Sequence, residues 1–589
     1  MKISEFSTLL AIVPLLLAPL ATAASAQQCP VTREAATYPD PPLTYPMISN
    51  RYAVQYKLDR GDWTDAQVHI SYYGGTKASP YLASSHYPPD TSMSFASIPT
   101  GASTTVALRI TKLWGSTFPE INRVSIRPRA KGIQVESVSS RTVQLSTKTA
   151  TDFAGDQFIL WWDGDTHESA GIQGLAFFLD PPYDRPTGRN VKAVAVPADL
   201  TGDLSSFDTL DFEGTVAIES TGAKAFIVPA HISSVFLAPG AWVQGKLRFE
   251  QSGAGHERRI YGPGVLDISR FGYMWRQCRN SNNHTDDGYQ SVSMIPLAAG
   301  TPGRPLLHDR FVLDGIIVSD SQYYATDLMV NAVINNVKII GWNGNSDGLA
   351  LGLKTRASNV FVRTGDDSLK MWGSSVTVTN ATVWQNWNGA VVNLGWSNNS
   401  SGDDGLIDGL YVVKTDWHTP IDISWNVKTS GSSNSVPNVT ALNSSNNAVI
   451  ASMLVPGATF GASHPSIYRN IYVEDPPQVL LSLKILPAIC SSIRMKTCPE
   501  VDVTQPSVLN LNIENVFTPE SVVKNSIGFQ NLPGGSTLKG SMNIDLANVV
   551  VTLRHGVATP LTSANAAILG KVVTNGDHVN VEYKAERRP

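Results

Sequence analysis

NVKIIGWNGNSDGLALGLKTRASNVFVRTGDDSLKMWGSSVTVTNATVWQNWNGAVVNLGW, residues 336–396, is the stretch that decides the fold. It repeats the pattern Asn-x-x-Val or Asn-x-x-Ile, with β-branched residues between Gly and Asn. The pattern begins at Asn336, Asn359 and Asn380, and a Gly form of it begins at Gly315 and Gly409. Successive starts are 21, 23, 21 and 29 residues apart. Short strands with this period cannot each bury their own apolar face, so the pattern predicts a β-solenoid of stacked coils.

The repeat also predicts where three acidic side chains lie. Aligning Leu349 with Leu369 places Asp347 over Asp367, with Asp366 beside it. Stacked coils are roughly 4.8 Å apart, so these carboxylates are expected to share one small region of the surface.

Carboxylates at such a separation disfavour joint ionisation, which can keep one acid protonated beside an ionised base. Glycoside hydrolysis uses this division, because an acid protonates the departing oxygen while a base activates water. The alternative is that these Asp residues only form turns. We prefer the functional interpretation because aromatic residues and a lysine are near in sequence: Lys370, Trp372, Trp384, Trp387 and Trp396.

Two other acidic pairs serve as comparisons. Asp286-Asp287 and Asp403-Asp404 each precede a glycine, yet neither has an acidic partner one coil away in an aromatic setting. We predict that both pairs form exposed turns.

The motifs around the acids resemble glycoside hydrolase family 49, which contains dextranases and isopullulanase. The similar segments are NSDG (Asn345–Gly348), GDDSLKMW (Gly365–Trp372), TVWQ (Thr382–Gln385) and LGW (Leu394–Trp396), with scattered blocks upstream. Members of that family have a β-sandwich followed by a right-handed parallel β-helix, and they invert the anomeric centre with three aspartates. The resemblance implies that Asp366 is the general acid and that Asp347 and Asp367 hold the attacking water.

The chain departs from the family pattern around this trio. Ala350 stands where an acidic residue is usual, Gly352 lies where a Tyr is expected, and Trp372 replaces a Tyr. These differences leave the cleaved linkage open.

The first residues predict an exported protein. Residues 1–26 contain Lys2, an apolar run from Leu9 to Leu20, and small residues up to Ala26, as a cleaved signal peptide does. An uncleaved anchor is the alternative. No other apolar stretch is long enough for a membrane helix. We therefore expect a secreted protein that is not held in a membrane.

Composition favours an all-β protein of more than one domain. Charged residues make up 16% of the 589 residues, and no long window shows helical periodicity. The formal net charge of −4 provides no basic stripe for nucleic acid. We expect a monomer without a cofactor.

Four cysteines follow the signal: Cys29, Cys278, Cys490 and Cys498. In an oxidising compartment, Cys490 and Cys498 are the expected disulfide, although spacing alone allows three connectivities. No Cys-x-x-Cys motif or close pair of histidines indicates a metal site. Glycosylation sequons occur at Asn283, Asn380, Asn398, Asn399, Asn438 and Asn443, and a glycan at Asn380 is expected to conflict with the repeat.

The chain divides into two predicted domains. Residues 27–185 alternate in short strands with turn signals about every ten residues, which predicts a sandwich of two antiparallel sheets. The segment Asp180–Asn190 is rich in proline and is the predicted boundary. Residues 186–589 would then form the parallel β-helix with the acids.

The favoured substrate is an α-glucan polysaccharide such as dextran or pullulan. Lys370, Trp372, Trp396 and Trp275 are the predicted substrate-binding residues, because aromatic faces pack on sugar rings and the ammonium group donates to hydroxyls. A pectin hydrolase resembling family 28 is one alternative, but Gly-His-Gly and Arg-Ile-Lys do not follow Asp367. A non-catalytic carbohydrate-binding solenoid is another, since a fold alone does not establish activity.

Overall fold

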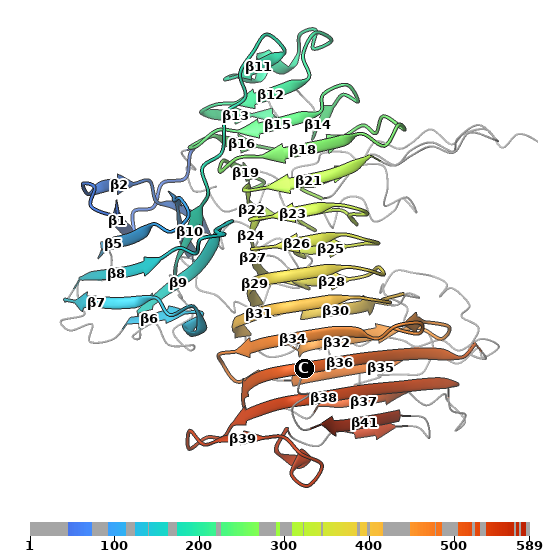
Figure 1. Ribbon diagram of the computed structural model, residues 1–589. Coiled ribbons are helices and arrows are strands. Elements are labelled where there is room, and N and C mark those ends of the chain that lie inside the picture. The colour runs from blue at the N-terminus through green and yellow to red at the C-terminus, as the bar shows by residue number, and fades with distance from the viewer. Residues whose placement is uncertain are drawn as a thin grey trace, which may run out of the picture.

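A computed structural model shows an all-β chain with a small domain beside the middle of a tall stack of coils (Figure 1). The structure describes residues 45–72, 92–113, 124–139, 141–162, 174–218, 225–269, 290–294, 309–321, 323–342, 346–385, 389–396, 401–415, 448–477, 479–485, 505–520, 525–529, 538–569, 573–575 and 579–584. Within these ranges the helical elements are short 3-10 turns: η1 (Arg129–Lys131), η2 (Pro197–Leu200) and η6 (Ala566–Leu569).

The small domain is a sandwich of two five-stranded sheets, in the orders β2-β1-β5-β8-β7 and β3-β4-β10-β9-β6. The strands are β1 (Tyr52–Leu58), β2 (Thr64–Ala66), β3 (His69–Tyr72), β4 (Ser92–Pro99), β5 (Thr105–Lys112), β6 (Val124–Arg127), β7 (Gln134–Val138), β8 (Thr142–Lys148), β9 (Asp156–Trp162) and β10 (Leu175–Asp180). The prediction of two purely antiparallel sheets is wrong in one respect, because β4 and β10 pair in parallel. These two strands are far apart in the chain, so no hairpin forces them to run in opposite directions.

A strand-free segment separates the sandwich from the stack. The last sandwich strand ends at Asp180, and β11 (Val191–Val194) begins the stack. The residues between them include the proline-rich segment that was expected to hold the boundary. The exact division between domains stays a prediction.

One continuous parallel sheet of 21 strands forms most of the stack. Its strands after β11 are β12 (Thr209–Phe212), β13 (Thr215–Ala217), β15 (Ser234–Leu237), β16 (Trp242–Gln244), β18 (Glu257–Tyr261), β19 (Val265–Asp267), β21 (Arg310–Asp314), β22 (Ile317–Ser321), β23 (Val333–Asn335), β24 (Lys338–Gly341), β26 (Arg356–Ser358), β27 (Phe361–Thr364), β29 (Thr377–Gln385), β31 (Leu406–Thr415), β33 (Thr459–Phe460), β34 (Ser466–Val473), β36 (Ser507–Pro519), β38 (Gly540–Thr552), β39 (Ala558–Pro560) and β41 (Val579–Lys584). Only β39 runs antiparallel, against β38.

Two further parallel sheets close the coils on the other side. The three-stranded sheet contains β14 (Ala225–Val228), β17 (Lys246–Phe249) and β20 (Val292–Met294). The seven-stranded sheet contains β25 (Leu349–Leu351), β28 (Leu369–Met371), β30 (Ala390–Trp396), β32 (Ala448–Leu454), β35 (Val479–Ile485), β37 (Ser526–Phe529) and β40 (Val573–Asn575). The predicted parallel β-helix is therefore confirmed.

The repeated Asn and Gly residues form the corner at which the long sheet bends. Asn336, Asn359 and Asn380 have φ values of 52°, 54° and 51°, and Gly315 and Gly409 have 83° and 80°. This left-handed region strains most side chains but is accessible to Gly and Asn. The repeat visible in the sequence is thus the corner residue of each coil.

The corner asparagines also bond from coil to coil. Asn380 Nδ2 donates to Asn359 Oδ1 at 2.8 Å, and Asn359 Nδ2 donates to Asn335 Oδ1 at 3.2 Å. A glycan on Asn380 would be attached to the nitrogen that donates in this ladder, and the conflict between this sequon and the repeat stays a prediction.

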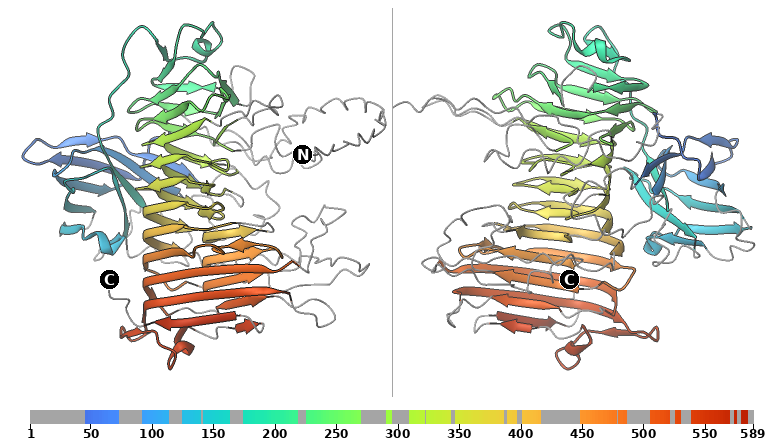
Figure 2. Two further views of the ribbon diagram at one scale, coloured as in Figure 1. Left: turned by 45° about the vertical axis from the view of Figure 1, so that its right-hand side comes forward. Right: turned by 180° about the vertical axis from the view of Figure 1, so that it is seen from behind.

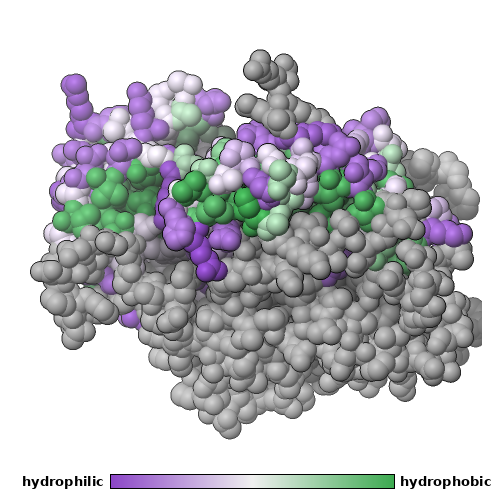
Figure 3. Space-filling view, turned by 90° about the horizontal axis from the view of Figure 1, so that it is seen from below, coloured by the Kyte–Doolittle hydropathy of each residue, from purple (hydrophilic) through white to green (hydrophobic). Residues whose placement is uncertain are grey.

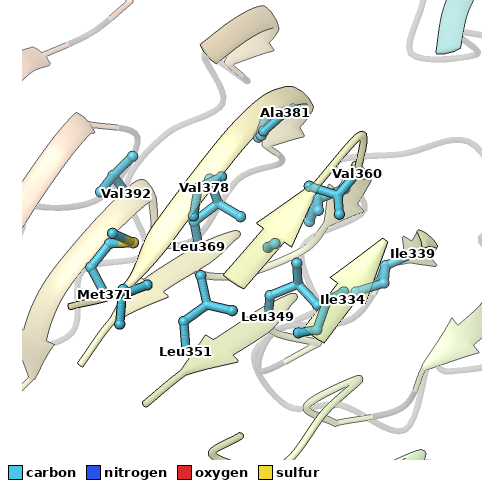
Figure 4. Packing of buried hydrophobic residues seen from close by; sticks show 14 of the residues in the cluster. Ile334, Ile339, Leu349, Leu351, Val360, Leu369, Met371, Val378, Ala381 and Val392 are labelled. Atoms are coloured by element: carbon cyan, nitrogen blue, oxygen red, sulfur yellow. The ribbon is translucent and has the colours of Figure 1, made fainter. Parts of the chain in front are cut away.

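The core lies between the two walls of each coil (Figure 4). Leu349, Leu369 and Val392 come from successive strands of the seven-stranded sheet, and they face residues of the long sheet such as Val360 and Val378. Because each layer buries its apolar side chains against its neighbours, the turns at the ends of these strands are held in a fixed register.

The sandwich packs on the outer face of the long sheet (Figure 2), through aromatic and charged contacts. The rings of Trp161 and Trp384 meet edge to face with centroids 4.9 Å apart. The buried Lys338 pairs with Asp180 and donates to the carbonyl oxygen of Gly315 at 3.0 Å. Sequence proximity had placed Trp384 near the acids, which is wrong: the residue belongs to the domain interface on another wall of the coil.

Several predictions concern residues outside those described. They include the signal peptide of residues 1–26, the disulfide of Cys490 and Cys498, the binding residue Trp275, the acidic pair at Asp286, and the remaining sequons. Among the described residues, no helix has the length and apolarity needed to cross a membrane.

The C-terminal end of the stack, seen from below in Figure 3, presents apolar residues between hydrophilic ones. Val579, Val581 and Tyr583 of β41 pack against the core while remaining partly exposed. The core residues Met542 and Ile544 of the neighbouring strand β38 are buried.

Candidate active site

The three predicted acids lie in the turns that lead into two neighbouring strands of the seven-stranded sheet. Asp347 precedes β25, and Asp366 and Asp367 precede β28. Leu349 pairs with Leu369, as predicted from the repeat. The backbone N–H of Gly348 donates to the carbonyl oxygen of Asp367 at 2.8 Å, so the two turns are hydrogen-bonded to each other.

Buried hydroxyl groups hold the second turn. Thr364 Oγ1 donates to the carbonyl oxygen of Asp366 at 2.9 Å and lies 2.9 Å from Ser368 Oγ. The N–H of Gly365 donates to Ser346 Oγ of the coil above at 3.0 Å. These contacts leave the acids little freedom, as a preorganised site requires.

The carboxylates form one compact cluster. One oxygen from each of Asp347, Asp366 and Asp367 lies within 4.8 Å of the others. The residues are 3%, 6% and 4% exposed. This approach is closer than the roughly 6.5–9.5 Å expected of an inverting acid and base, so the spacing alone does not select the stereochemistry. Three carboxylates at this distance are also the one set within the described ranges whose spacing suits a metal ion.

Lys370 already supplies a positive charge to this cluster. Its ammonium group forms an ion pair with Asp347 Oδ2 and lies 3.7 Å from Asp367 Oδ2. The same group lies 3.8 Å from the ring centroid of Tyr324 and 4.5 Å from that of Trp372. Lys370, predicted to bind substrate, is thus buried between two carboxylates and two aromatic rings, and its contact with a sugar stays a prediction.

Tyr323 and Tyr324 belong to the site and were not identified in the sequence. Their rings stack with centroids 4.6 Å apart and an interplanar angle of 7°. Burial, followed by the charge of Asp347, raises the pKa of Tyr323 to about 12 and that of Tyr324 well above its usual value. Both phenols therefore stay neutral. In the sequence, the only indication of their role is that a Tyr-Tyr pair lies one coil before an acid.

Asp367 receives an N–H donor on each oxygen. The backbone N–H of Ala390 donates to Oδ1 at 2.8 Å, and Asn393 Nδ2 donates to Oδ2 at 2.9 Å. Asn393 in turn accepts from Trp372 Nε1 at 3.1 Å. Asn393 was missed because the sequence does not show that its strand pairs with the strand of Lys370. That pairing brings Asn393 to the site.

Burial and the charges of the cluster both act on Asp347. Burial, and then the negative charges of Asp366 and Asp367, raise the pKa of Asp347 well above its usual value, although the ion pair with Lys370 opposes this. For Lys370, burial lowers the pKa, but the carboxylate of Asp347 outweighs it and raises the pKa well above the ordinary value. The cluster therefore combines a charged ammonium with carboxylates that compete for a proton.

Gly389 lies in the next coil, and its backbone packs directly against Asp366 and Asp367. Its φ is +77°, and a Cβ there would lie 2.4 Å from the backbone nitrogen of Asp367 and 2.6 Å from Asp366 Oδ1. The close approach of backbone to carboxylate is possible because glycine has no side chain.

The other predicted positions are Trp372, Trp396 and the acidic pair Asp403-Asp404. Trp372 lies at the site, with its indole on Asn393 and Lys370. Trp396 ends β30, and only its backbone is described. Asp403 and Asp404 form a turn as predicted: Asp403 Oδ1 accepts from the N–H of Ser463 at 2.9 Å, and Asp404 has a φ of 56°.

The fold and the site define a parallel β-helix protein with an appended sandwich and a buried cluster of three aspartates. Over 181 residues the chain is 31% identical to a dextranase of Arthrobacter globiformis, covering 29% of this chain and 27% of that protein. It is 29% identical over 205 residues to an isopullulanase of Aspergillus niger, covering 33% and 34%. No protein-family model matches the chain.

The fold as a whole resembles the solved structure of Dex49A from Penicillium minioluteum. The TM-score is 0.62 at 15% identity, covering 91% of this chain and 94% of that one. The chain is thus a dextranase- and isopullulanase-like protein, and the resemblance to glycoside hydrolase family 49 is confirmed. It spans 27% and 34% of the length of the two curated relatives.

Proposed function

We propose that this chain is a glycoside hydrolase that cleaves α-glucosidic linkages in a polysaccharide such as dextran or pullulan. The observation that carries the proposal is the cluster of three buried carboxylates, contributed by adjacent coils and arranged around Lys370. Relatives with the names dextranase and isopullulanase support the substrate class. The chemistry needs a proton donor for the leaving oxygen and a base for water, and the chain offers both from carboxylates.

The contacts of the cluster bear on the roles of the three acids. Lys370 pairs with Asp347, and Asp367 accepts two N–H donors, so both carboxyl groups are held in place. Asp366 also accepts an N–H, from the backbone of Asp367 at 2.8 Å, so hydrogen bonding alone does not single out the acid. The family resemblance supports Asp366 as the general acid. Asp347 and Asp367 would together orient and deprotonate the attacking water.

A competing assignment gives the proton to Asp347, because its pKa is raised well above the usual value by burial. The two assignments predict different behaviour with an aryl glycoside, whose phenolate departs without a proton. Replacing the true acid should spare hydrolysis of such a substrate, whereas replacing a base should abolish it. Comparing Asp366→Asn with Asp347→Asn on a nitrophenyl glycoside therefore decides between them.

Inversion at the anomeric carbon is part of the proposal and is supported by the family resemblance. Two aspartates that hold one water would deliver it to the face opposite the leaving group, with no covalent intermediate. Proton NMR of the earliest product should then show the β-anomer from an α-linked glucan. An initial α-anomer, or a sugar ester trapped on Asp347 or Asp367, would contradict this mechanism.

The primary test is release of reducing sugar from dextran, pullulan and polygalacturonate, measured side by side. Release from one of the glucans is the expected result. Release from polygalacturonate alone would favour the pectin hydrolase, and binding without release would favour a non-catalytic solenoid. The signal-like residues 1–26 support the further proposal that the protein is secreted, which fractionation would check. We also propose a monomer, which size-exclusion chromatography would check.

A further inference from the structure

We propose that Asn393 is a positioning residue that holds the carboxyl group of Asp367 in its direction, and that Trp372 acts on the reaction by fixing Asn393. The inference rests on the proposed function, because Asp367 is a base only in that mechanism. It assigns Trp372 a role through its indole N–H in addition to any contact between its ring and a sugar.

The orientation of the Asn393 amide follows from its partners. Trp372 Nε1 lies 3.1 Å from Asn393 Oδ1, and the backbone nitrogen of Gly395 lies 2.8 Å from the same oxygen. An indole N–H and a backbone N–H can only donate, so the side of the amide that faces them must be the oxygen. The amide nitrogen is therefore directed at Asp367 Oδ2, 2.9 Å away.

The same reasoning fixes the direction of the Asp367 carboxyl group. Its Oδ1 faces the N–H of Ala390 and its Oδ2 faces Asn393 Nδ2, at 2.8 Å and 2.9 Å. Both nitrogens can only donate, so each oxygen of Asp367 is held as an acceptor in a buried site. The ammonium of Lys370 lies 3.7 Å from Oδ2 on the same carboxyl group. A base that is fixed in direction is what activation of water requires.

The position of Asn393 depends on the stacking of coils. Asn393 on β30 pairs in register with Lys370 on β28, and Trp372 directly follows the last residue of β28. The hydrogen bonds from Trp372 to Asn393 and from Asn393 to Asp367, here called the relay, thus run from one coil to the next and back again. They tie the direction of the Asp367 carboxyl group to the positions of β28 and β30.

Asn393→Asp is the sharpest variant because it keeps the oxygen that accepts from Trp372 and Gly395. It removes the donor to Asp367 and adds a negative charge beside it, so the acidic limb of the kcat/KM profile should move up by about one pH unit or more. We expect kcat to fall about tenfold to a hundredfold, the scale of a misplaced catalytic group, with KM changed less than about twofold. Asn543→Asp is the matched control, since Asn543 is exposed on β38 and its replacement should leave the pH profile unchanged.

Trp372→Phe tests the relay, because it keeps an aromatic ring and removes the indole N–H. In the wild-type background it should lower kcat about threefold to tenfold, consistent with one lost hydrogen bond. In the Asn393→Ala background the same change should have almost no further effect, since the acceptor is already gone. Additive effects of the two changes, or a raised KM with unchanged kcat in Trp372→Phe, would overturn the relay.

A carboxyl spectrum separates this inference from the proposed function. In protein labelled with carbon-13 at the aspartate carboxyl, the Asp367 resonance can be assigned by its loss in Asp367→Asn. At constant pH its chemical shift should change in Asn393→Ala, which removes the donor without adding a charge, and stay unchanged in Asn543→Ala, with or without hydrolysis. If no glucan is cleaved but this chemical shift changes, the proposed function fails and the positioning by Asn393 stands. An unchanged Asp367 chemical shift in Asn393→Ala would refute the inference even in an active enzyme.

Discussion

Replacing Lys370 by methionine tests how the cluster maintains its charge. Methionine has a similar length and no charge, so it should fill the space between Tyr324 and Trp372 without a donor. The ammonium lies 3.7 Å from Asp367 Oδ2 and closer to Asp347. At an effective dielectric constant of about 20, two unit charges about 4 Å apart attract by about 4 kcal/mol, so loss of the ammonium group removes an interaction of this order from the cluster.

The sign follows from the charge that is lost. Lys370 favours the ionised form of Asp347, so its removal raises the apparent pKa of Asp347 further and the base is lost at a higher pH. The acidic limb of kcat/KM should therefore move upward by about one to three pH units. The assay is reducing-sugar release across the pH range on the glucan that the wild-type protein cleaves.

A lysine that only binds sugar would behave differently. In that case Lys370→Met would raise KM and leave the acidic limb where it is, which would refute the electrostatic role. Lys148→Met is the control, because Lys148 is exposed in the sandwich and its loss should alter neither parameter.

Three further changes probe the acid, the close approach of coils, and the domain interface. Asp366→Asn should lower turnover at least ~10²-fold on polysaccharide, whereas Asp404→Asn in the exposed turn should have no effect; the reverse result would show that the wrong acidic pair was chosen. Gly389→Ala should abolish activity with little change in the far-ultraviolet spectrum, because its Cβ would overlap Asp366 and Asp367; wild-type turnover would show that the turn relaxes freely. Burial, and then the charge of a neighbouring carboxylate, raises the pKa of Asp320 to about 8. This native pKa exceeds the unfolded value, so the contribution of Asp320 to stability falls as pH rises from about 4 to about 8. In Asp320→Asn that loss should disappear, and the melting temperature relative to wild type should rise between pH 5 and pH 8; a constant difference would contradict the shift.

The stacking register could be predicted because the corner residues are chemically restricted. Asn336, Asn359 and Asn380 recur where only Asn or Gly fits well, so their spacing measures the length of each coil. The corner spacing of 21 to 23 residues predicts stacked coils, and matching the leucines that follow the acids then predicts the pairing of Leu349 with Leu369 and the meeting of Asp347 and Asp367. Backbone restriction at the corners, together with the matched motifs, was therefore enough to bring together residues that are 20 apart.

Which wall of the coil a residue occupies could not be read in the same way. Trp384 and Trp372 are both near the acids in sequence, but Trp384 packs against Trp161 of the sandwich while Trp372 reaches Asn393. The direction of a side chain depends on which strand of the coil it lies on and on where the sandwich docks. Neither is a property of local spacing.

The sequence by itself determined the β-helix, the coil length and the meeting of Asp347 with Asp367, because these depend on short motifs and backbone preferences repeated along the chain. Only the tertiary structure decided which groups surround the acids. The ammonium of Lys370 between Asp347 and Asp367, the amide of Asn393 on Asp367, and the glycine beneath Asp366 are contacts between coils. Their effect depends on distances of a few ångströms and on burial, and a pattern of residue types contains neither quantity.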